Sequence, residues 1–484
     1  MGTLPEGFGL VLDPSLRRFR HGSVLAGGRP GRILTLTPDG ARALDALVAG
    51  GSADTATRTL AGRLVAGGMA HPRRPAIPDA LDTSSSGHTA IDGPDATQVT
   101  VVVPVRDRAD SLDRCLASLG RDVPVVVVDD ASDDPDSVAA VCRRYGARLV
   151  RRTTNGGPGA ARDSATGSVV TELVAYVDSD CTVPDGWMDK LVWQFGDPAI
   201  GGVAPRVRPA PVAPERQRRV VHRFGLAHSP LDLGPDEGEV GPNRAVRYVP
   251  TAALVVRRTA LEEVGGFDPT LRVGEDVDLV WRLIGAGWRI RYDPSVEVSH
   301  REPDRWPDLL VRRLHYGTSA APLAIRHPGR LAPVELRPRA TMAAVALLAG
   351  RPAAAAVAVA SSAAPLARTV RPSGIPAVQA WRWSAAGAAW TVMGIGRAAT
   401  MLAAPGLVAL AATGRRGRRA AMALVLVPPI VDWVRHRPDL DLPRWVVASV
   451  ADDMAYGTGV WIGCLRARSA SALLPAIVRT PDES

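Results

Sequence analysis

Leu173-Val174-Ala175-Tyr176-Val177 is an apolar run that leads directly into Asp178-Ser179-Asp180. Such a run predicts a buried strand, and alternate residues of an extended chain point the same way, so the two carboxylates converge on one point. Mg²⁺ and Mn²⁺ prefer oxygen ligands and leave coordination positions for phosphate groups. The stretch therefore predicts a divalent-cation site. The alternative is a solvated turn, which is the usual fate of an isolated acidic pair at the end of a strand.

Further strands and helices alternate around this stretch. The pattern predicts strands over Gln98–Val105, Val123–Val128 and Arg148–Arg151, and a helix over Asp110–Leu119. Alternation of this kind favours an α/β domain with a parallel sheet, in which ligands bind at the carboxyl ends of the strands. We therefore expect the residues that follow each strand to gather at one edge of the sheet.

These residues suit the parts of a nucleotide-sugar. Asp129 or Asp130 can accept a hydrogen bond from the N3–H of a uracil, Asp178 can bond to ribose hydroxyls, and Asp180 can hold a cation against the diphosphate. The glycines of the segment 155–159 let backbone approach a ring closely and lead into a helix N-terminus, which favours negative charge. A flexible turn is the alternative interpretation of that segment.

Two acidic residues and a histidine follow further downstream. Glu275 and Asp276 are predicted to begin a helix, where carboxylates are favoured by exposed N–H groups and the helix dipole. The same position would let Asp276 act as a general base on an acceptor hydroxyl. Val296–His300 reads as a strand that ends in a histidine. His300 is then either a structural hydrogen-bonding residue or, as we predict, a metal ligand beside Asp180.

Taken in order, these motifs resemble those of the family-2, inverting glycosyltransferases with the GT-A fold, a Rossmann-like α/β domain. The matching pieces, within residues 97–320, are V-V-P-V-R-D-R, V-V-V-D-D-A-S, N-G-G-P-G-A-A-R, Y-V-D-S-D, G-G-F-D and G-E-D-V-D-L-x-x-R-L. The resemblance implies a nucleoside-diphosphate sugar donor, Mg²⁺ or Mn²⁺, inversion by single displacement, and Asp276 as the catalytic base. The donor-binding positions would be Pro104, Arg106, Asp129, Asp130, Asn155, Gly157, Arg162, Asp178, Ser179 and Glu275.

One motif of this family is missing. Its processive polysaccharide synthases carry Gln-x-x-Arg-Trp after the Glu-Asp pair, whereas residues 310–317 read L-V-R-R-L-H-Y-G. A synthase of long chains, similar to those of cellulose or hyaluronan, is therefore disfavoured. Repeated addition of a few sugars remains compatible with the sequence.

The layout of the whole chain is similar to that of the glycosyltransferases of mycofactocin biosynthesis in actinobacteria. The similarity rests on a small N-terminal domain, an Arg/Ala-rich tail, and the stretch V-P-T-A-A-L-V-V-R-R-T-A-L at residues 249–261. It implies transfer of a sugar, glucose from UDP-glucose in β-linkage, to a small peptide-derived redox cofactor. The rival interpretation is a cell-envelope enzyme that extends a lipid-linked glycan, and a second rival is a non-enzymatic binding scaffold.

The chain divides into four predicted parts. Residues 1–78 form a small domain in which a strand at Arg32–Thr37, helices at Pro38–Val48 and Asp54–Ala66, and a hairpin over Gly67–Pro72 suggest a winged helix. That domain would bind a peptide, or serve in packing or dimerisation. Residues 79–96 are a linker, and 97–330 are the GT-A domain. Within the latter, residues 205–248 are predicted to be a long irregular loop on the acceptor side of the cleft.

Residues 331–484 are Ala- and Arg-rich and predicted to be α-helical. The longest uncharged run, Ala398–Gly414, is borderline for one membrane span and is followed by four arginines at 415, 416, 418 and 419. A helical hairpin on the catalytic domain or an interfacial helix are the alternatives. We expect membrane association at the cytoplasmic face of a bacterial cell membrane.

Charge and cysteine content narrow the possible partners. The net charge of +9 is compatible with a polyphosphate substrate, anionic lipid or nucleic acid. No nucleic-acid-binding motif or basic stripe studded with aromatic residues is present, so nucleic acid is not expected as a partner. The four cysteines are scattered without a C-x-x-C pair, which fits a reducing cytosol.

Overall fold

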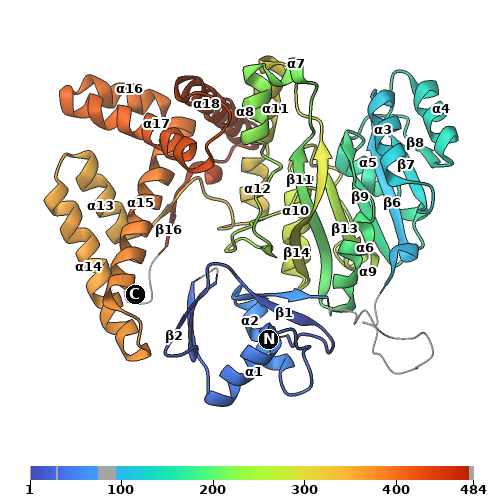
Figure 1. Cartoon of the computed structure of the whole chain (residues 1–484). Helices are drawn as coiled ribbons and strands as arrows, with labels where there is room; N and C mark the ends of the chain where they lie inside the picture. The colour runs from blue at the N-terminus through green and yellow to red at the C-terminus, as the bar shows by residue number, and fades with distance from the viewer. Residues whose placement is uncertain (1, 29–30, 75–93, 479–484) are drawn as a thin grey trace. The chain divides into compact units, whose positions relative to one another are not determined.

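The computed structural model describes residues 2–28, 31–74 and 94–478. Most of the predicted linker at 79–96 lies outside the described residues. The chain forms two compact units (Figure 1): unit 1 comprises Met1–Pro211 and Pro230–Arg301, and unit 2 comprises Val212–Ser229 and Glu302–Ser484. Unit 1 contains both the small N-terminal domain and the large sheet.

The N-terminal domain combines short strands with two helices. Strands β2 (Arg17–Phe19), β3 (Val24–Gly27) and β4 (Arg32–Thr35) form one antiparallel sheet. Helix α1 (Pro38–Val48) begins where the Thr37 side chain accepts a hydrogen bond from the Gly40 N–H, and Pro38 has the fixed φ that suits a first helical turn. Helix α2 (Arg58–Ala66) covers the same core, in which Leu44 and Leu64 are fully buried.

The hairpin expected over Gly67–Pro72 is not formed. Strand β5 (Ala70–Arg73) pairs instead with β1 (Gly9–Leu12), in antiparallel register from Leu12 opposite Ala70 to Gly9 opposite Arg73. The partner strand lies about sixty residues away in the sequence, so local turn chemistry could not reveal the pairing.

The second part of unit 1 is a nine-stranded mixed sheet. Strands β6 (Val99–Val105), β7 (Val125–Asp129), β8 (Arg148–Arg151) and β9 (Leu173–Val177) run parallel, in the spatial order β9-β6-β7-β8. Every residue of β6 and β9 is buried, as expected of strands covered on both faces. Helices α3 (Ala109–Leu119) and α4 (Pro135–Tyr145) connect the first three strands. The predicted α/β fold is confirmed.

Beyond β9 the sheet becomes mixed. Strand β13 (Ala253–Arg257) is antiparallel to both β9 and β11 (Ile200–Pro209), and β14 (Arg289–His300) is parallel to β11. The short strands β10 (Cys181–Thr182) and β12 (Gly238–Glu239) each pair with β14. The carboxyl end of β14 therefore lies at the same edge as the carboxyl ends of β6, β7 and β9.

The remaining helices of unit 1 are short. They are α5 (Pro158–Ser164), α6 (Trp187–Val192), α9 (Arg258–Glu263) and α10 (Glu275–Gly285). Helix α10 begins after Gly274, whose φ of 80° is a conformation that glycine adopts without steric cost. The sequence prediction of a helix beginning at Glu275 is confirmed.

The stretch 205–248 is more regular than predicted. It contains the end of β11, the helices α7 (Pro214–Gln217) and α8 (Val220–Ala227), and strand β12. The apolar residues Val221 and Phe224, spaced by one helical turn, join a hydrophobic cluster with Leu309 and Trp445 of unit 2. The expectation of one continuous loop is wrong because this apolar pair gives α8 a buried face.

Unit 2 is helical, as the sequence predicts. Besides α7 and α8, its helices are α11 (Trp306–Thr318), α12 (Ala320–Arg326), α13 (Pro338–Leu348), α14 (Pro352–Val370), α15 (Ala377–Leu402), α16 (Ala404–Ala412), α17 (Arg415–His436) and α18 (Leu442–Ala467), and β15 (Glu335–Leu336) pairs with β16 (Ala476–Ile477). Glycines let α11 and α18 approach closely: a Cβ at Gly459 would lie 1.9 Å from the carbonyl oxygen of Leu314.

The uncharged run Ala398–Gly414 is not a single helix. It spans the end of α15 and all of α16, and these helices meet at an angle of 104°. Pro405 lies in the first turn of α16, where its ring prevents α15 from continuing. Among the described residues, one helical segment, Pro352–Ser373, is long and apolar enough to cross a membrane, and the bent pair raises that number to two at most.

Candidate active site

The Asp178-Ser179-Asp180 turn lies between β9 and β10. The N–H of Asp178 donates to the carbonyl of Ala252 (3.0 Å), and the carbonyl of Asp178 accepts from the N–H of Cys181 (2.9 Å). Ser179 is buried, whereas the side chains of Asp178 and Asp180 are 29% and 15% exposed. The turn therefore holds the backbone and leaves carboxylate oxygens at the sheet edge.

Asp180 contacts two side chains, one from the predicted metal ligand His300 and one from Arg108. Because Cys181 is opposite His300 in the β10–β14 register, the His300 Nε2 lies 3.6 Å from the Asp180 Oδ1. The Arg108 Nη1 donates to the Asp180 Oδ2 at 2.5 Å. Arg108 is not among the site residues predicted from the sequence, although it lies in the V-V-P-V-R-D-R piece, at the position that precedes α3.

The donor set at Asp180 suits a divalent cation that is completed by substrate. No group of three or more His, Cys, Asp or Glu side chains placed to hold a metal occurs among residues 2–28, 31–74 and 94–478. Mg²⁺ and Mn²⁺ commonly take only one or two protein ligands and fill the other positions with phosphate oxygens and water. Asp180 and His300 fit that pattern. In this structure the positive charge beside the Asp180 carboxylate comes from Arg108.

The two aspartates at the end of β7, Asp129 within the strand and Asp130 directly after it, are both turned into the protein. Asp129 is fully buried, and its Oδ1 accepts from the N–H of Ser132 (2.9 Å). Asp130 accepts from the N–H groups of Gly156 (2.9 Å) and Gly157 (2.8 Å). Asp130 thus fixes the glycine-rich segment that is predicted to contact the donor, and the Asn155 Oδ1 also accepts a hydrogen bond from the Gly157 N–H (3.0 Å).

The other predicted donor-binding residues near β6 differ in exposure. Pro104 is buried within β6, opposite Val128 of β7. Arg106, whose side chain is 45% exposed, lies 3.3 Å from the Asp107 carboxylate through its Nε. Asp107 in turn accepts a hydrogen bond from the Asp133 N–H (2.6 Å), which ties the loop after β6 to the loop after β7.

Arg162 is inside the protein rather than at the surface of the site. Its residue is 2% exposed, and its guanidinium donates to the Glu275 Oε1 (3.0 Å) and to the Asp178 Oδ1 (2.5 Å). It also lies over the ring of Phe267, with 5.6 Å from its central carbon to the ring centroid. The glycine-rich segment is therefore joined both to the Asp-Ser-Asp turn and to the start of α10.

The predicted base, Asp276, lies in the first turn of α10 and is partly exposed. Burial of its carboxyl group and the adjacent Glu275 carboxylate raise the pKa of Asp276 to about 7. Burial also raises the pKa of Glu275, which Arg162 opposes. A carboxyl group that titrates near neutral pH at the edge of a site is suited to accept a proton from a hydroxyl.

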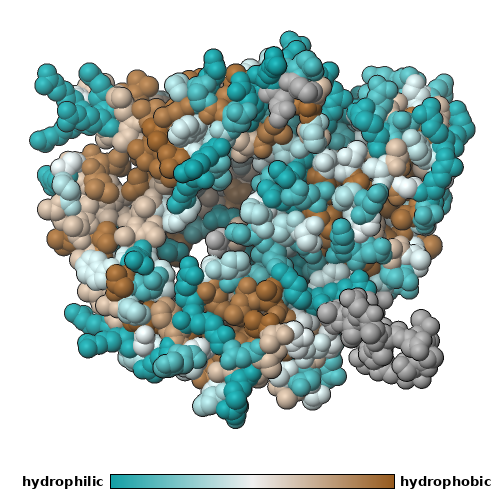
Figure 2. Space-filling view, viewed as in Figure 1, coloured by the Kyte–Doolittle hydropathy of each residue, from teal (hydrophilic) through white to brown (hydrophobic). Residues whose placement is uncertain are grey.

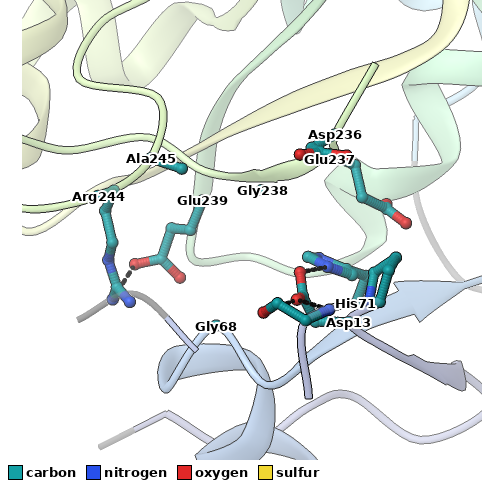
Figure 3. A pocket seen from close by; sticks show the side chains of 11 residues that line it. Asp13, Gly68, His71, Asp236, Glu237, Gly238, Glu239, Arg244 and Ala245 are labelled. Carbon is teal, nitrogen blue, oxygen red and sulfur yellow. Dashed lines mark hydrogen bonds and ion pairs between the residues drawn. The ribbon is translucent and has the colours of Figure 1, made fainter. Parts of the chain in front are cut away.

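A cavity lies between the N-terminal domain and the segment 236–245, which includes β12 (Figure 3). It encloses about 70 Å³ and is lined by residues that include Asp13, His71, Glu237 and Arg244. The His71 Nε2 lies 2.9 Å from the Asp13 Oδ2, and Arg73 is paired with Glu237. None of the predicted donor-binding, metal or catalytic residues lines this cavity.

Comparisons with known proteins agree with the fold and with the family resemblance. The profile of the family "Glycosyl transferase family 2" matches residues 100–265. The chain is 36% identical to the pre-mycofactocin glycosyltransferase of Mycobacterium tuberculosis over 98% of both chains. It is 30% identical to the N-acetylglucosaminyl-diphospho-decaprenol L-rhamnosyltransferase of the same organism, over 45% of this chain and 81% of that one.

Among solved structures, the mannosyltransferase PcManGT from Pyrobaculum calidifontis, in complex with GDP-Man and Mn²⁺, is similar at 20% identity and a TM-score of 0.44, over 77% of this chain and 89% of that one. The relationship itself is established by the full-length relative, because 36% identity extends through all parts of both chains. The chain is a glycosyltransferase and belongs to family 2, together with the pre-mycofactocin glycosyltransferase.

Proposed function

We propose that this enzyme is a metal-dependent, inverting glycosyltransferase that adds one or more glucose units from UDP-glucose, in β-linkage, to a small peptide-derived redox cofactor precursor. The observation that carries the chemistry is that Arg162 joins Asp178 to Glu275, which brings the Asp178-Ser179-Asp180 turn and the Glu275-Asp276 pair to one site. The acceptor is inferred from the full-length similarity to the pre-mycofactocin glycosyltransferase.

In this proposal Asp276 removes the proton of the acceptor hydroxyl as the oxygen attacks the anomeric carbon, and the nucleoside diphosphate leaves from the opposite face. Asp276 is suited to this because its raised pKa makes it a better base than an ordinary aspartate while leaving it largely ionised above neutral pH. The cation, held by Asp180 and His300, would neutralise the charge of the leaving diphosphate. Arg108 is paired with Asp180, so its positive charge also lies beside the proposed cation site.

The full-length similarity favours the cofactor precursor over a glycan as acceptor. The rhamnosyltransferase covers only 45% of this chain, whereas the pre-mycofactocin enzyme also matches the N-terminal domain and the helical unit. A second candidate, extension of a lipid-linked glycan, is favoured by that same rhamnosyltransferase similarity and by the apolar surface of unit 2.

We also propose that unit 2 associates with the cytoplasmic face of the cell membrane. Residues 336–431 contain eleven arginines and no aspartate or glutamate. Of the twenty-three exposed large hydrophobic residues in the described part of the chain, twenty belong to unit 2 and three to unit 1. Figure 2 shows hydrophobic residues at the surface over its helices. Positive charge next to exposed apolar side chains is the pattern that binds anionic lipid headgroups.

The decisive test is sugar transfer by the purified enzyme with Mn²⁺ or Mg²⁺ and UDP-, GDP- and dTDP-sugars. Each donor is offered with the peptide-derived cofactor precursor and, separately, with a polyprenyl-diphosphate-linked sugar. We expect glucose transfer from UDP-glucose to the precursor, and loss of transfer in Asp180→Ala. Transfer only to the lipid-linked acceptor would replace the first proposal by the second. Absence of transfer from every donor to both acceptors would refute both.

A further inference from the structure

The side chain of Arg162 is buried and makes its hydrogen bonds inside the protein. One guanidinium contacts two carboxylates that belong to different elements: Asp178, directly after β9, and Glu275, the first residue of α10. Both the Nη1 and the Nη2 are engaged in these contacts, and the Nε is buried without a hydrogen-bond partner among the described residues. With its residue 2% exposed, Arg162 is not placed to contact a nucleotide directly.

The helix that carries Arg162 is packed tightly enough to hold this arrangement. A Cβ at Gly159, one turn before Arg162 on α5, would lie 3.0 Å from the Cγ of Glu275 and 3.6 Å from the Cβ of Phe267. The glycine thus lets α5 lie directly against the start of α10. Because Phe267 also packs against the guanidinium, the side chain of Arg162 has little freedom to leave its two partners.

The charges around Asp276 come from three neighbours on three elements. Glu275 on α10 and Asp178 after β9 are like charges that disfavour ionisation of Asp276, and Arg162 on α5 favours it. The N–H of Val277 also donates to the Asp276 Oδ1 (2.7 Å). Arg162 is therefore the cation that offsets the mutual repulsion of these carboxylates.

We propose that Arg162 is a positioning residue that couples the donor side of the site to the acceptor side. Through Asp178 it orders the Asp178-Ser179-Asp180 turn, which faces the donor. Through Glu275 it keeps Asp276 available as an ionised base. The proposal rests on the proposed function for the roles of Asp178 and Asp276. It assigns Arg162 no contact with the sugar donor, in contrast to the interpretation from the sequence.

The test compares Arg162→Gln with Arg282→Gln. Arg282 is a matched control because it lies on α10, the helix that Arg162 contacts through Glu275. Arg282 also pairs with a carboxylate of α10, Asp278 (2.7 Å), and donates to the carbonyls of Val264 and Gly266. Two quantities are measured for each folded variant: the dissociation constant of UDP with Mn²⁺, by calorimetry, and the acid limb of the pH profile of kcat/KM for transfer from UDP-glucose.

For Arg162→Gln we expect UDP binding weakened about tenfold and the acid limb moved upward by about one pH unit, because Asp178 loses a charge-assisted bond and Asp276 loses its nearest cation. Glu275→Gln removes a like charge and should move the acid limb in the opposite direction. Arg282→Gln should lower thermal stability and change neither quantity. An unchanged acid limb together with unchanged UDP affinity in folded Arg162→Gln would overturn the proposal.

Arg162→Lys decides the matter if Arg162→Gln does not fold. A lysine keeps the charge but is a single point donor that cannot reproduce the forked contact with two carboxylates. At least one of the two quantities should then change, and wild-type values for both would overturn the proposal. If the wild-type enzyme itself neither binds UDP nor transfers sugar, the proposed function fails instead, so the two failures are distinguishable.

Discussion

At the scale of single residues, the proposed mechanism assigns the removal of the acceptor proton to Asp276. Replacing it with asparagine keeps the size and the hydrogen bond from Val277 but removes the proton acceptor. We expect Asp276→Asn to lower kcat by about 10²–10⁴-fold, the range that general-base catalysis contributes. Binding of UDP, measured by calorimetry, should stay within about twofold of wild type. Near-normal turnover in this variant would show that another group is the base.

The pKa of Asp276 predicts the pH dependence of the enzyme. With a pKa raised to about 7, Asp276 is protonated at lower pH and cannot accept a proton. The value of kcat/KM should therefore fall about tenfold for each pH unit below the pKa and level off above it. A profile measured from pH 5 to 9, with enzyme stability checked at each pH, tests this. An acid limb near pH 4, the range of an ordinary aspartate, would contradict the environment described for Asp276.

Arg108 provides a test of the metal site that does not require activity. It places its guanidinium on Asp180, so it should compete with a divalent cation for that carboxylate. Its side chain is 60% exposed, and exposed ion pairs contribute up to about 1 kcal/mol, so Arg108→Gln should tighten Mn²⁺ binding by up to about fivefold. Titration of Mn²⁺ without nucleotide measures this. The control is Arg144→Gln, which breaks a similar pair with Asp113 (2.6 Å) away from Asp180. Equal changes in both variants would argue against Asp180 as a ligand.

At the scale of elements, the sequence predicted those features that depend on local pattern. The bounds of α1 match the prediction because Thr37, Pro38 and the apolar spacing all act within one helix. The β1–β5 pairing and the burial of Arg162 depend on residues far apart in the chain, and no local pattern encodes them. Pro405 is a local feature from which the bend between α15 and α16 was predictable. The run was instead interpreted from its lack of charge, which carries no information about a bend.

Helix contacts in unit 2 predict opposite effects for two glycine substitutions. A Cβ at Gly459 would collide with the carbonyl oxygen of Leu314, whereas a Cβ at Gly387 would meet no atom within 4 Å. Gly459→Ala should therefore destabilise the unit by about 1–3 kcal/mol, because α11 and α18 must separate. Gly387→Ala should stabilise it by about 0.5–1 kcal/mol, since alanine restricts the unfolded chain. Thermal unfolding of both variants measures the difference, and shifts of the same sign would contradict the packing described for α11 and α18.

At the scale of the whole molecule, the N-terminal domain and the catalytic residues of unit 1 meet different ends of β14. The domain pairs Arg73 with Glu237, next to β12, which is opposite Arg291 and Tyr292 of β14. His300 ends the same strand nine residues beyond Arg291, but a bulge takes up part of that length. Their partners on β11, Pro209 and Val203, are six residues apart, which corresponds to about 20 Å at about 3.3 Å per residue. The contact of the N-terminal domain with Glu237 and the predicted metal ligand His300 therefore lie toward opposite ends of β14.

The cationic, apolar surface of unit 2 predicts binding to anionic membranes. The purified enzyme should float with vesicles of phosphatidylcholine and phosphatidylglycerol, but much less with phosphatidylcholine alone, and added salt should weaken binding. Replacing the exposed arginines 415, 416, 418 and 419 with glutamine should reduce flotation by at least about tenfold, at about 1 kcal/mol per residue. The matched control replaces four exposed arginines of unit 1, at positions 17, 42, 63 and 121, and should leave flotation unchanged.

Equal loss of flotation in both variants would mean that net charge alone drives binding. Flotation that is insensitive to lipid charge and salt would instead indicate insertion of apolar helices, with Pro352–Ser373 as the first segment to delete.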